Sequence, residues 1–304
     1  MAKQPTLLEQ FRSFYFQNKA TDMEQAIKYF AVFGGTSWEV DLGVPLDQLI
    51  EKKVLNNYKY IHADITKITQ SNKHAHAILT GIALGDGRVH SALKKARLSR
   101  SDGEYALEDL FERGLLEDEF SLESSPNEED NIDEKLNFTT PFMRFWFSFI
   151  SPFFKGIKEG DYKEAKEKFA NRQQEFSELI FSKLSQEVLK KGFKHDPIAE
   201  VGSYWDRNTQ VDLLAITKSG KIVAGICKNS NAKAKKTELT KLKEQCEKAQ
   251  LKADIHVVIS KNGFSNELKT LKGADLRLFS LKNFKSLVED LDQQDFIACE
   301  GKRY

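Results

Sequence analysis

Two groups of closely spaced lysines and arginines are the residues of this 304-residue sequence best suited to contacting phosphate. The first consists of Lys94, Lys95 and Arg97. The second follows Lys228 and contains Lys233, Lys235, Lys236, Lys241 and Lys243. Cationic side chains can hold a DNA backbone without reading its base sequence, so both groups are candidate nucleic-acid contacts. The alternative is that they form only solvated helix and loop faces. Because the net charge is only +1, any basic footprint must be local.

Several other kinds of chemistry are not supported by the residue pattern. No G-x-x-x-x-G-K-[ST] segment occurs, so we expect neither ATP binding nor ATPase activity. Cys227, Cys246 and Cys299 include no C-x-x-C pair, which argues against a zinc site and a disulfide framework and favours a reducing cytoplasm. His74 and His76 would point to different faces of a helix and make a poor metal pair. No run of 18 apolar residues occurs, so we expect no membrane span.

The elements that must position these residues begin with a helical region. Apolar residues at helical spacing predict helices through residues 6–60, and Gly34 with Gly35 ends the run over residues 26–33. Three further short helices are predicted over residues 74–114, followed by a short hairpin within residues 115–122. This order is typical of a winged helix-turn-helix. Residues 124–134 are acidic and polar, which predicts an exposed loop or a wing extension.

The pattern changes in the C-terminal half. A charged helix is predicted at about residues 161–172, and a long amphipathic helix from residue 176 to about Gly192. Strands are predicted at 199–204, 211–217 and 221–228, the last two joined by a turn at Ser219 and Gly220. Next come a helix at 237–251, strands at 254–260 and 276–281, and a helix at 283–291. The order is α-β-β-β-α-β with an added β-α, so the fold class is α/β.

Two segments carry a family resemblance. Residues 142–152 read FMRFWFSFISP, and residues 201–216 read VGSYWDRNTQVDLLAI. Together they resemble the C-terminal domain of the archaeal-type ATPase family, which is similar to PD-(D/E)XK nucleases. Residues 29–35 (YFAVFGG) and 76–85 (HAILTGIALG) resemble the family's ATPase lid and the first helix of its winged-helix domain.

The resemblance implies three domains without the P-loop ATPase domain. These are a helical lid-like remnant at 1–70, a winged helix-turn-helix at 71–135, and a restriction-endonuclease-like domain with an αβββαβ core at 136–304. In that core the lysine-rich group after Lys228 would flank the substrate groove.

The same resemblance assigns a partial nuclease site. Asp212 matches the strand aspartate and Lys228 the lysine of the family pattern, but Ile226 stands where an acidic ligand is expected. Ser182 stands at the helix glutamate position, with Glu178 one turn away. Such a set would hold Mg²⁺ poorly, so we expect no metal and no catalysis. Two alternatives remain open: a carboxylate from Glu200 or Asp206 could complete the site, or Asp212 and Lys228 could form only an ion pair.

The third helix of the winged-helix segment carries carboxylates, whereas a helix that reads DNA usually carries hydrogen-bond donors or positive charges. They are Glu104, Glu108, Asp109 and Glu112, and Arg113 in the last turn is the helix's only basic residue after Arg100. Carboxylates repel phosphate, so this helix is expected to contact protein rather than the major groove.

The sequence therefore favours a non-catalytic nuclease-fold protein that binds DNA backbone or a protein partner. One alternative is a Mg²⁺-dependent DNA endonuclease with a migrated carboxylate. The second is a pure protein-interaction module of a split ATPase.

Overall fold

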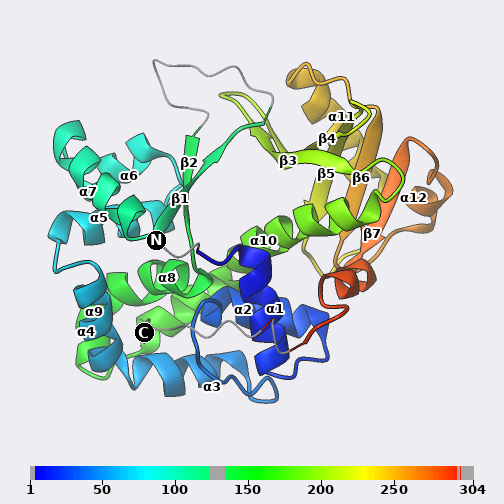
Figure 1. Cartoon of the computed structure of the whole chain (residues 1–304). Coiled ribbons are helices and arrows are strands. Elements are labelled where there is room, and N and C mark those ends of the chain that lie inside the picture. The colour runs from blue at the N-terminus through cyan, green and yellow to red at the C-terminus, as the bar shows by residue number, and fades with distance from the viewer. Residues whose placement is uncertain (1–3, 123–133, 293–294, 296–304) are drawn as a thin grey trace. The chain divides into compact units, whose positions relative to one another are not determined.

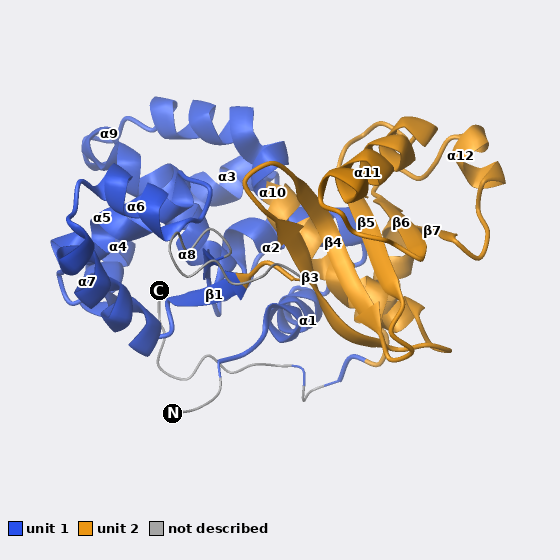
Figure 2. Ribbon diagram, turned by 90° about the horizontal axis from the view of Figure 1, so that it is seen from above, with its two compact units in different colours: residues 1–119, 134–176, 291–304 blue, residues 120–133, 177–290 orange. Residues whose placement is uncertain are grey.

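The chain forms two compact units. The computed structural model describes residues 4–122, 134–292 and 295 (Figure 1). One unit, called unit 1, comprises residues 1–119, 134–176 and 291–304, and unit 2 comprises residues 120–133 and 177–290 (Figure 2). The acidic loop predicted at 124–134 lies outside the described residues except for Glu134. The domain limits predicted at residues 70 and 135 stay predictions.

Unit 1 is mainly helical, as the sequence predicts. Its helices are α1 Leu7–Gln17, α2 Met23–Phe33, α3 Leu46–Ile50, α4 Tyr58–Ile68, α5 Lys73–Ala83, α6 Val89–Ala96, α7 Arg100–Glu112, α8 Pro141–Phe145 and α9 Phe154–Lys158 (Figure 1). Thr6 and Glu9 form a capping box at the start of α1. The expected end of α2 at Gly34 is confirmed, and a Cβ there would lie 2.6 Å from the carbonyl oxygen of Phe30.

The hairpin predicted within residues 115–122 is wrong. Strand β1 Leu116–Phe120 instead pairs with β2 Glu134–Phe138, which follows the acidic segment in the sequence. The chain does not turn back after β1, because residues 121 and 122 bond to the edge of unit 2's sheet. The Ser121 hydroxyl donates to the carbonyl of Trp205 at 2.8 Å, and the Leu122 amide donates to that of Ser203 at 2.9 Å. The identity of the α5–α7 region as a winged helix stays a prediction.

An aromatic cluster forms the core of unit 1. Helix α8 continues into a π-helical segment, Trp146–Ile150, whose five residues are all buried. Trp146 stacks on Tyr58 with ring centroids 5.5 Å apart. Phe149 meets Phe176 edge to face at 5.0 Å. The most apolar stretch of the sequence is therefore a packed interior, and no helix in the described part of the chain is long and apolar enough to cross a bilayer.

Helix α10, Lys163–Gly192, is one continuous helix where two are predicted. The residues between the two predicted segments are Gln173, Gln174 and Glu175, which have good helix propensity and include neither glycine nor proline. Nothing in that stretch ends a helix, so the charged first part runs directly into the amphipathic second part. Residues up to 176 belong to unit 1 and the rest to unit 2.

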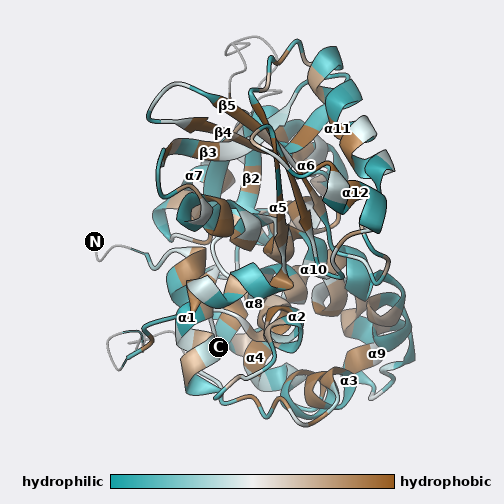
Figure 3. Cartoon of the chain, turned by 90° about the vertical axis from the view of Figure 1, so that its right-hand side faces the viewer, coloured by the Kyte–Doolittle hydropathy of each residue, from teal (hydrophilic) through white to brown (hydrophobic). Residues whose placement is uncertain are grey.

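Unit 2 contains a five-stranded mixed sheet in the order β3-β4-β5-β6-β7. Its strands are β3 Ile198–Trp205, β4 Gln210–Thr217, β5 Ile222–Lys228, β6 Ile255–Ser260 and β7 Leu276–Ser280. The first three are antiparallel, while β5, β6 and β7 are parallel. Helix α11, Lys236–Lys248, connects β5 to β6. The strand order along the chain and the turn at Gly220, which has a φ of +84°, agree with the sequence prediction. Central strands are largely hydrophobic (Figure 3).

Two short elements differ from the prediction. The helix expected at 283–291 is a 3-10 helix at Leu281–Leu287, where Ser280 and Asn283 form the capping box. A five-residue helix, α12 Asn266–Thr270, was not predicted. It is too short for apolar periodicity to show, although Ser265 provides an N-cap by accepting from the Leu268 amide.

Candidate functional site

The carboxyl ends of two parallel strands bring the predicted site residues of unit 2 to one edge of the sheet. Lys228 ends β5 and lies opposite Ser260, which ends β6. Helix α11 begins soon after β5 and places its N-terminal lysines near this edge. In open α/β sheets, ligands bind outside the carboxyl ends of the parallel strands. This edge is therefore the candidate site of unit 2.

Lys228 is already paired within this edge. Its ammonium forms an ion pair with Glu238 on α11, and both side chains are largely buried. Glu238 also accepts the Lys235 amide at 2.7 Å, as part of the cap of α11. Burial raises the pKa of Glu238, but the bonds from Lys228 and the Lys235 backbone outweigh it and lower the pKa. The suggested ion pair between Lys228 and Asp212 is thus wrong, since Glu238, which sequence reasoning missed, is the partner.

Asp212 lies on β4 and accepts a backbone hydrogen bond. The Cys227 amide donates to its Oδ2 at 3.0 Å. Burial raises the pKa of Asp212, while the Cys227 amide and the charge of Lys241 act in the opposite direction. The carboxyl group is therefore oriented by the neighbouring strand and held in a poorly solvated place.

Where the family pattern expects a second acidic ligand, the chain has an isoleucine whose side chain is packed in the hydrophobic core. Ile226 is only 6% exposed. It belongs to a hydrophobic cluster that includes Leu242 of α11 and Val258 of β6. Among the described residues, no three His, Cys, Asp or Glu side chains are grouped as a metal site requires. The donor set around Asp212 does not fit a Mg²⁺ ion, which needs several oxygen ligands.

The other carboxylates considered for this site have different surroundings. Asp206 stabilises the β3–β4 turn: its Oδ1 accepts the amides of Asn208 and Thr209 at 2.6 and 2.7 Å. Glu200 is exposed on β3. On α10, Ser182 bonds to the Cys227 thiol, whose pKa is raised by burial, and Glu178 adds to that rise. Neighbouring strand residues face opposite sides of a sheet, so Ser182 lies on the face opposite Ile226.

The lysines of the second basic group do not share one face. Lys233, Lys235 and Lys236 are exposed around the start of α11. Lys236 lies 3.6 Å from Glu267 of α12. Lys241 lowers the pKa of Asp212 on β4, whereas Lys243 contributes, after burial, to the lowered pKa of His256 on β6. Lys241 and Lys243 are thus on opposite flanks of α11, as a two-residue separation on a helix requires.

The first basic group lies on α6 of unit 1, and part of it has a structural role. Lys95 donates to the carbonyl of Leu84 and so caps the end of α5. Arg97 ends α6 in the left-handed conformation with a φ of +57°. Lys94, Lys95 and Arg97 are all exposed. Because Lys95 is held against α5, only Lys94 and Arg97 of this group lack such a structural contact within the described structure.

Helix α7 presents an acidic surface with one prominent aromatic ring. Glu104, Glu108 and Glu112 are exposed, with Glu104 paired to Arg100 at 2.8 Å, and Tyr105 is 77% exposed. Arg113 bonds to Asp109 at 2.7 Å, so its charge is compensated within the helix end. This surface is unsuited to phosphate and suited to a cationic partner.

The two histidines have separate surroundings. The Nε2 of His76 lies 2.6 Å from the Thr69 hydroxyl, and its ring meets Phe147 edge to face. Burial, and secondarily the charge of His62, lower the pKa of His76. His74 is exposed at the start of α5. The expectation that they point to different faces of a helix is confirmed.

We expect Asp212→Asn to stabilise the protein at neutral pH. The folded state raises the pKa of Asp212, so it favours the protonated carboxyl, and its stability falls as pH rises through that folded-state value. Asparagine removes the buried charge and keeps an oxygen for the Cys227 amide. Melting temperatures measured between about pH 4 and 8 should show a gain for Asp212→Asn that shrinks towards the acidic end. Glu200→Gln, an exposed change on β3, is the control, and identical pH profiles for both variants would contradict the expectation.

Comparison with known proteins identifies one similar family. Residues 146–240, which include all of α10, strands β3 to β5 and the start of α11, match a family model described as "Archaea bacterial proteins of unknown function". This match covers less than half of the chain and is consistent with a member of the archaeal-type ATPase family. No curated protein and no solved structure matches the chain.

Proposed function

We propose that this protein is a nuclease-like protein of the PD-(D/E)XK type that binds the DNA backbone without cleaving it. The binding surface is the edge of the sheet in unit 2 where β5 and β6 end and α11 begins. The observation that carries the proposal is the exposure of Lys233, Lys235 and Lys241 around an edge where Lys228 is already paired with Glu238. Lysines of this kind bind phosphates by counterion release and carry no base specificity.

Two features of the edge support binding without cleavage. Cleavage of a phosphodiester in such folds uses a metal ion to stabilise charge and to activate water. Here Ile226 places a buried hydrocarbon beside Asp212, and Lys228 is held by Glu238 instead of facing a substrate. The edge retains positive charge for holding a backbone and lacks the oxygen ligands for breaking one.

The test is the salt dependence of DNA binding by the full chain. We expect fluorescence anisotropy with a labelled duplex to show sequence-independent binding that weakens steeply with salt. Replacing Lys233, Lys235 and Lys241 together by Gln should weaken binding at low salt by about 10- to 100-fold. The salt slope should fall by about one for each replaced lysine that neutralises a phosphate in the parent chain. No cleavage of the duplex is expected with Mg²⁺ or Mn²⁺.

The matched control replaces three exposed lysines away from this edge, Lys248, Lys252 and Lys272, by Gln. It removes the same charge and should bind DNA nearly as tightly as the parent chain. Equal losses in the two triple variants would reduce the effect to net charge and contradict a defined surface. Metal-dependent cleavage that is abolished in Asp212→Ala would replace the proposal by an endonuclease function.

A second candidate function is protein binding through α7, favoured by the exposed Tyr105 among Glu104, Glu108 and Glu112. Exposed tyrosines are common anchors in protein interfaces, and the surrounding carboxylates would select a basic partner. A separate P-loop protein, with which this chain would form a split ATPase, is one such partner. Association that is abolished in Tyr105→Ser but kept in the lysine variant would favour this candidate over DNA binding.

A further inference from the structure

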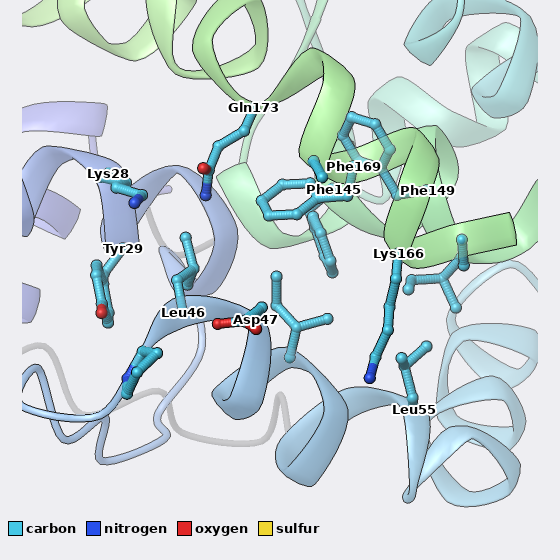
Figure 4. A pocket seen from close by; sticks show the side chains of 15 residues that line it. Lys28, Tyr29, Leu46, Asp47, Leu55, Phe145, Phe149, Lys166, Phe169 and Gln173 are labelled. Carbon is cyan, nitrogen blue, oxygen red and sulfur yellow. The ribbon is translucent and has the colours of Figure 1, made fainter. Parts of the chain in front are cut away.

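A cavity of about 370 Å³ lies within unit 1, among α2, α3, the π-helical segments and the first part of α10 (Figure 4). Three phenyl rings, those of Phe145, Phe149 and Phe169, form one wall. The ring of Phe169 lies 5.5 Å from that of Phe145 and 5.1 Å from that of Phe149, with both pairs close to perpendicular. The rings support one another, so the wall is preformed. The volume is in the range of small-molecule sites.

The rim of the cavity offers one uncompensated charge of each sign within the described part of the chain. Lys28 comes from α2 and Asp47 from α3, and both are exposed. Gln173 of α10 lies on the same side as Lys28 in Figure 4. The other lysine of the lining, Lys166, forms an ion pair with Glu51, so its charge is already compensated. The charge of Asp47 contributes, after burial, to the raised pKa of Tyr29 in the same lining.

Two π-helical segments contribute to the same cavity. Glu51–Leu55 supplies Leu55, and Trp146–Ile150 supplies Phe149 and Ile150. π-helical turns are rare and are found frequently at functional sites. The coincidence of both segments at one cavity is a second feature, independent of charge, that points to a ligand.

We propose that this cavity binds a free α-amino acid with a large apolar side chain. The ligand's carboxylate would accept from the ammonium of Lys28 and the amide of Gln173, and its ammonium would donate to the carboxylate of Asp47. Its side chain would lie against the phenyl wall. A hydrocarbon would gain no interaction from either rim charge, and a ligand with one charge would gain from only one of them. This proposal does not depend on DNA binding by unit 2.

The experiment is isothermal titration of the full chain with L-phenylalanine. Saturable binding is expected. N-acetyl-L-phenylalanine lacks the ammonium and L-phenylalaninamide lacks the carboxylate, so each should bind at least about tenfold more weakly. Glycine lacks the apolar side chain and should give no measurable binding. Absence of saturation up to about 10 mM L-phenylalanine, or equal affinity for all three phenylalanine derivatives, would overturn the proposal.

Two exposed substitutions locate the site. Asp47→Asn should weaken L-phenylalanine binding about tenfold and remove its advantage over the N-acetyl derivative, because both compounds then lack the same ion pair. Lys28→Gln should instead remove the advantage over the amide. Glu39→Gln and Lys52→Gln are charge-matched exposed controls and should bind as the parent does. Unchanged affinity in both rim variants would place binding elsewhere and overturn the proposal, and unchanged melting temperatures would show that folding is unaffected.

Discussion

Replacing Trp146 by Ala should destabilise unit 1 by about 3–5 kcal/mol, the usual cost of removing a large aromatic side chain from a packed core. Trp146 is only 1% exposed. Its ring stacks nearly parallel on Tyr58, with an interplanar angle of 9°, and also meets Phe142. The Tyr58 hydroxyl has no hydrogen-bond partner in the described structure, and burial raises the pKa of Tyr58 to about 12. The stacked pair is therefore held by packing rather than by polar contacts.

Equilibrium urea unfolding followed by circular dichroism measures this loss. The matched control is Phe154→Ala, an aromatic residue of the following helix that is 40% exposed. Its loss should cost clearly less than that of Trp146, on the order of 1 kcal/mol, because less buried surface is removed. The two units can unfold in separate steps, so the unfolding curve must first be resolved into its transitions. Similar losses for the two variants would contradict the assignment of Trp146 to the core.

Replacing Ile226 by Glu should destabilise unit 2 on the order of 3–5 kcal/mol and should not restore nuclease activity. The substitution returns an acidic residue to the position where the family resemblance expects one. The new carboxylate would enter the hydrophobic cluster that contains Leu242 and Val258, beside the already buried Asp212. A second charge in that environment lacks solvent, and the nearby Lys228 is already paired with Glu238.

Melting temperatures with and without Mg²⁺, together with a DNA cleavage assay, decide this prediction. Ile226→Val keeps the site apolar and should cost only about 0.5–1.5 kcal/mol. If Mg²⁺ restored the stability of Ile226→Glu, the edge would still be able to assemble an oxygen-ligand site. Cleavage by that variant would show that one substitution separates the protein from an active nuclease, contrary to the packing seen here.

Much of the architecture follows from local sequence rules. The apolar period over residues 26–33 and the glycine that follows it predict α2 and its end, because helix formation and termination depend on neighbouring residues. The alternating and apolar runs after residue 198 likewise predict the strands of unit 2 in their correct order. The sequence predictions fail where a structure depends on residues distant in the sequence. Ser121 and Leu122 form hydrogen bonds with β3, so the chain after β1 cannot form the predicted hairpin.

Residue identity alone determined that Ile226 cannot ligate a metal and that the lysines near α11 can attract phosphate. Only the tertiary structure decided which of those groups are available. Glu238 forms an ion pair with Lys228. The helical periodicity of α11 places Lys241 and Lys243 on opposite flanks of the helix. The cavity in unit 1 also required the fold, since Lys28, Asp47 and Gln173 come from three helices. Charge and hydrophobicity belong to each residue, whereas pairing and burial depend on partners that the chain brings together only when folded.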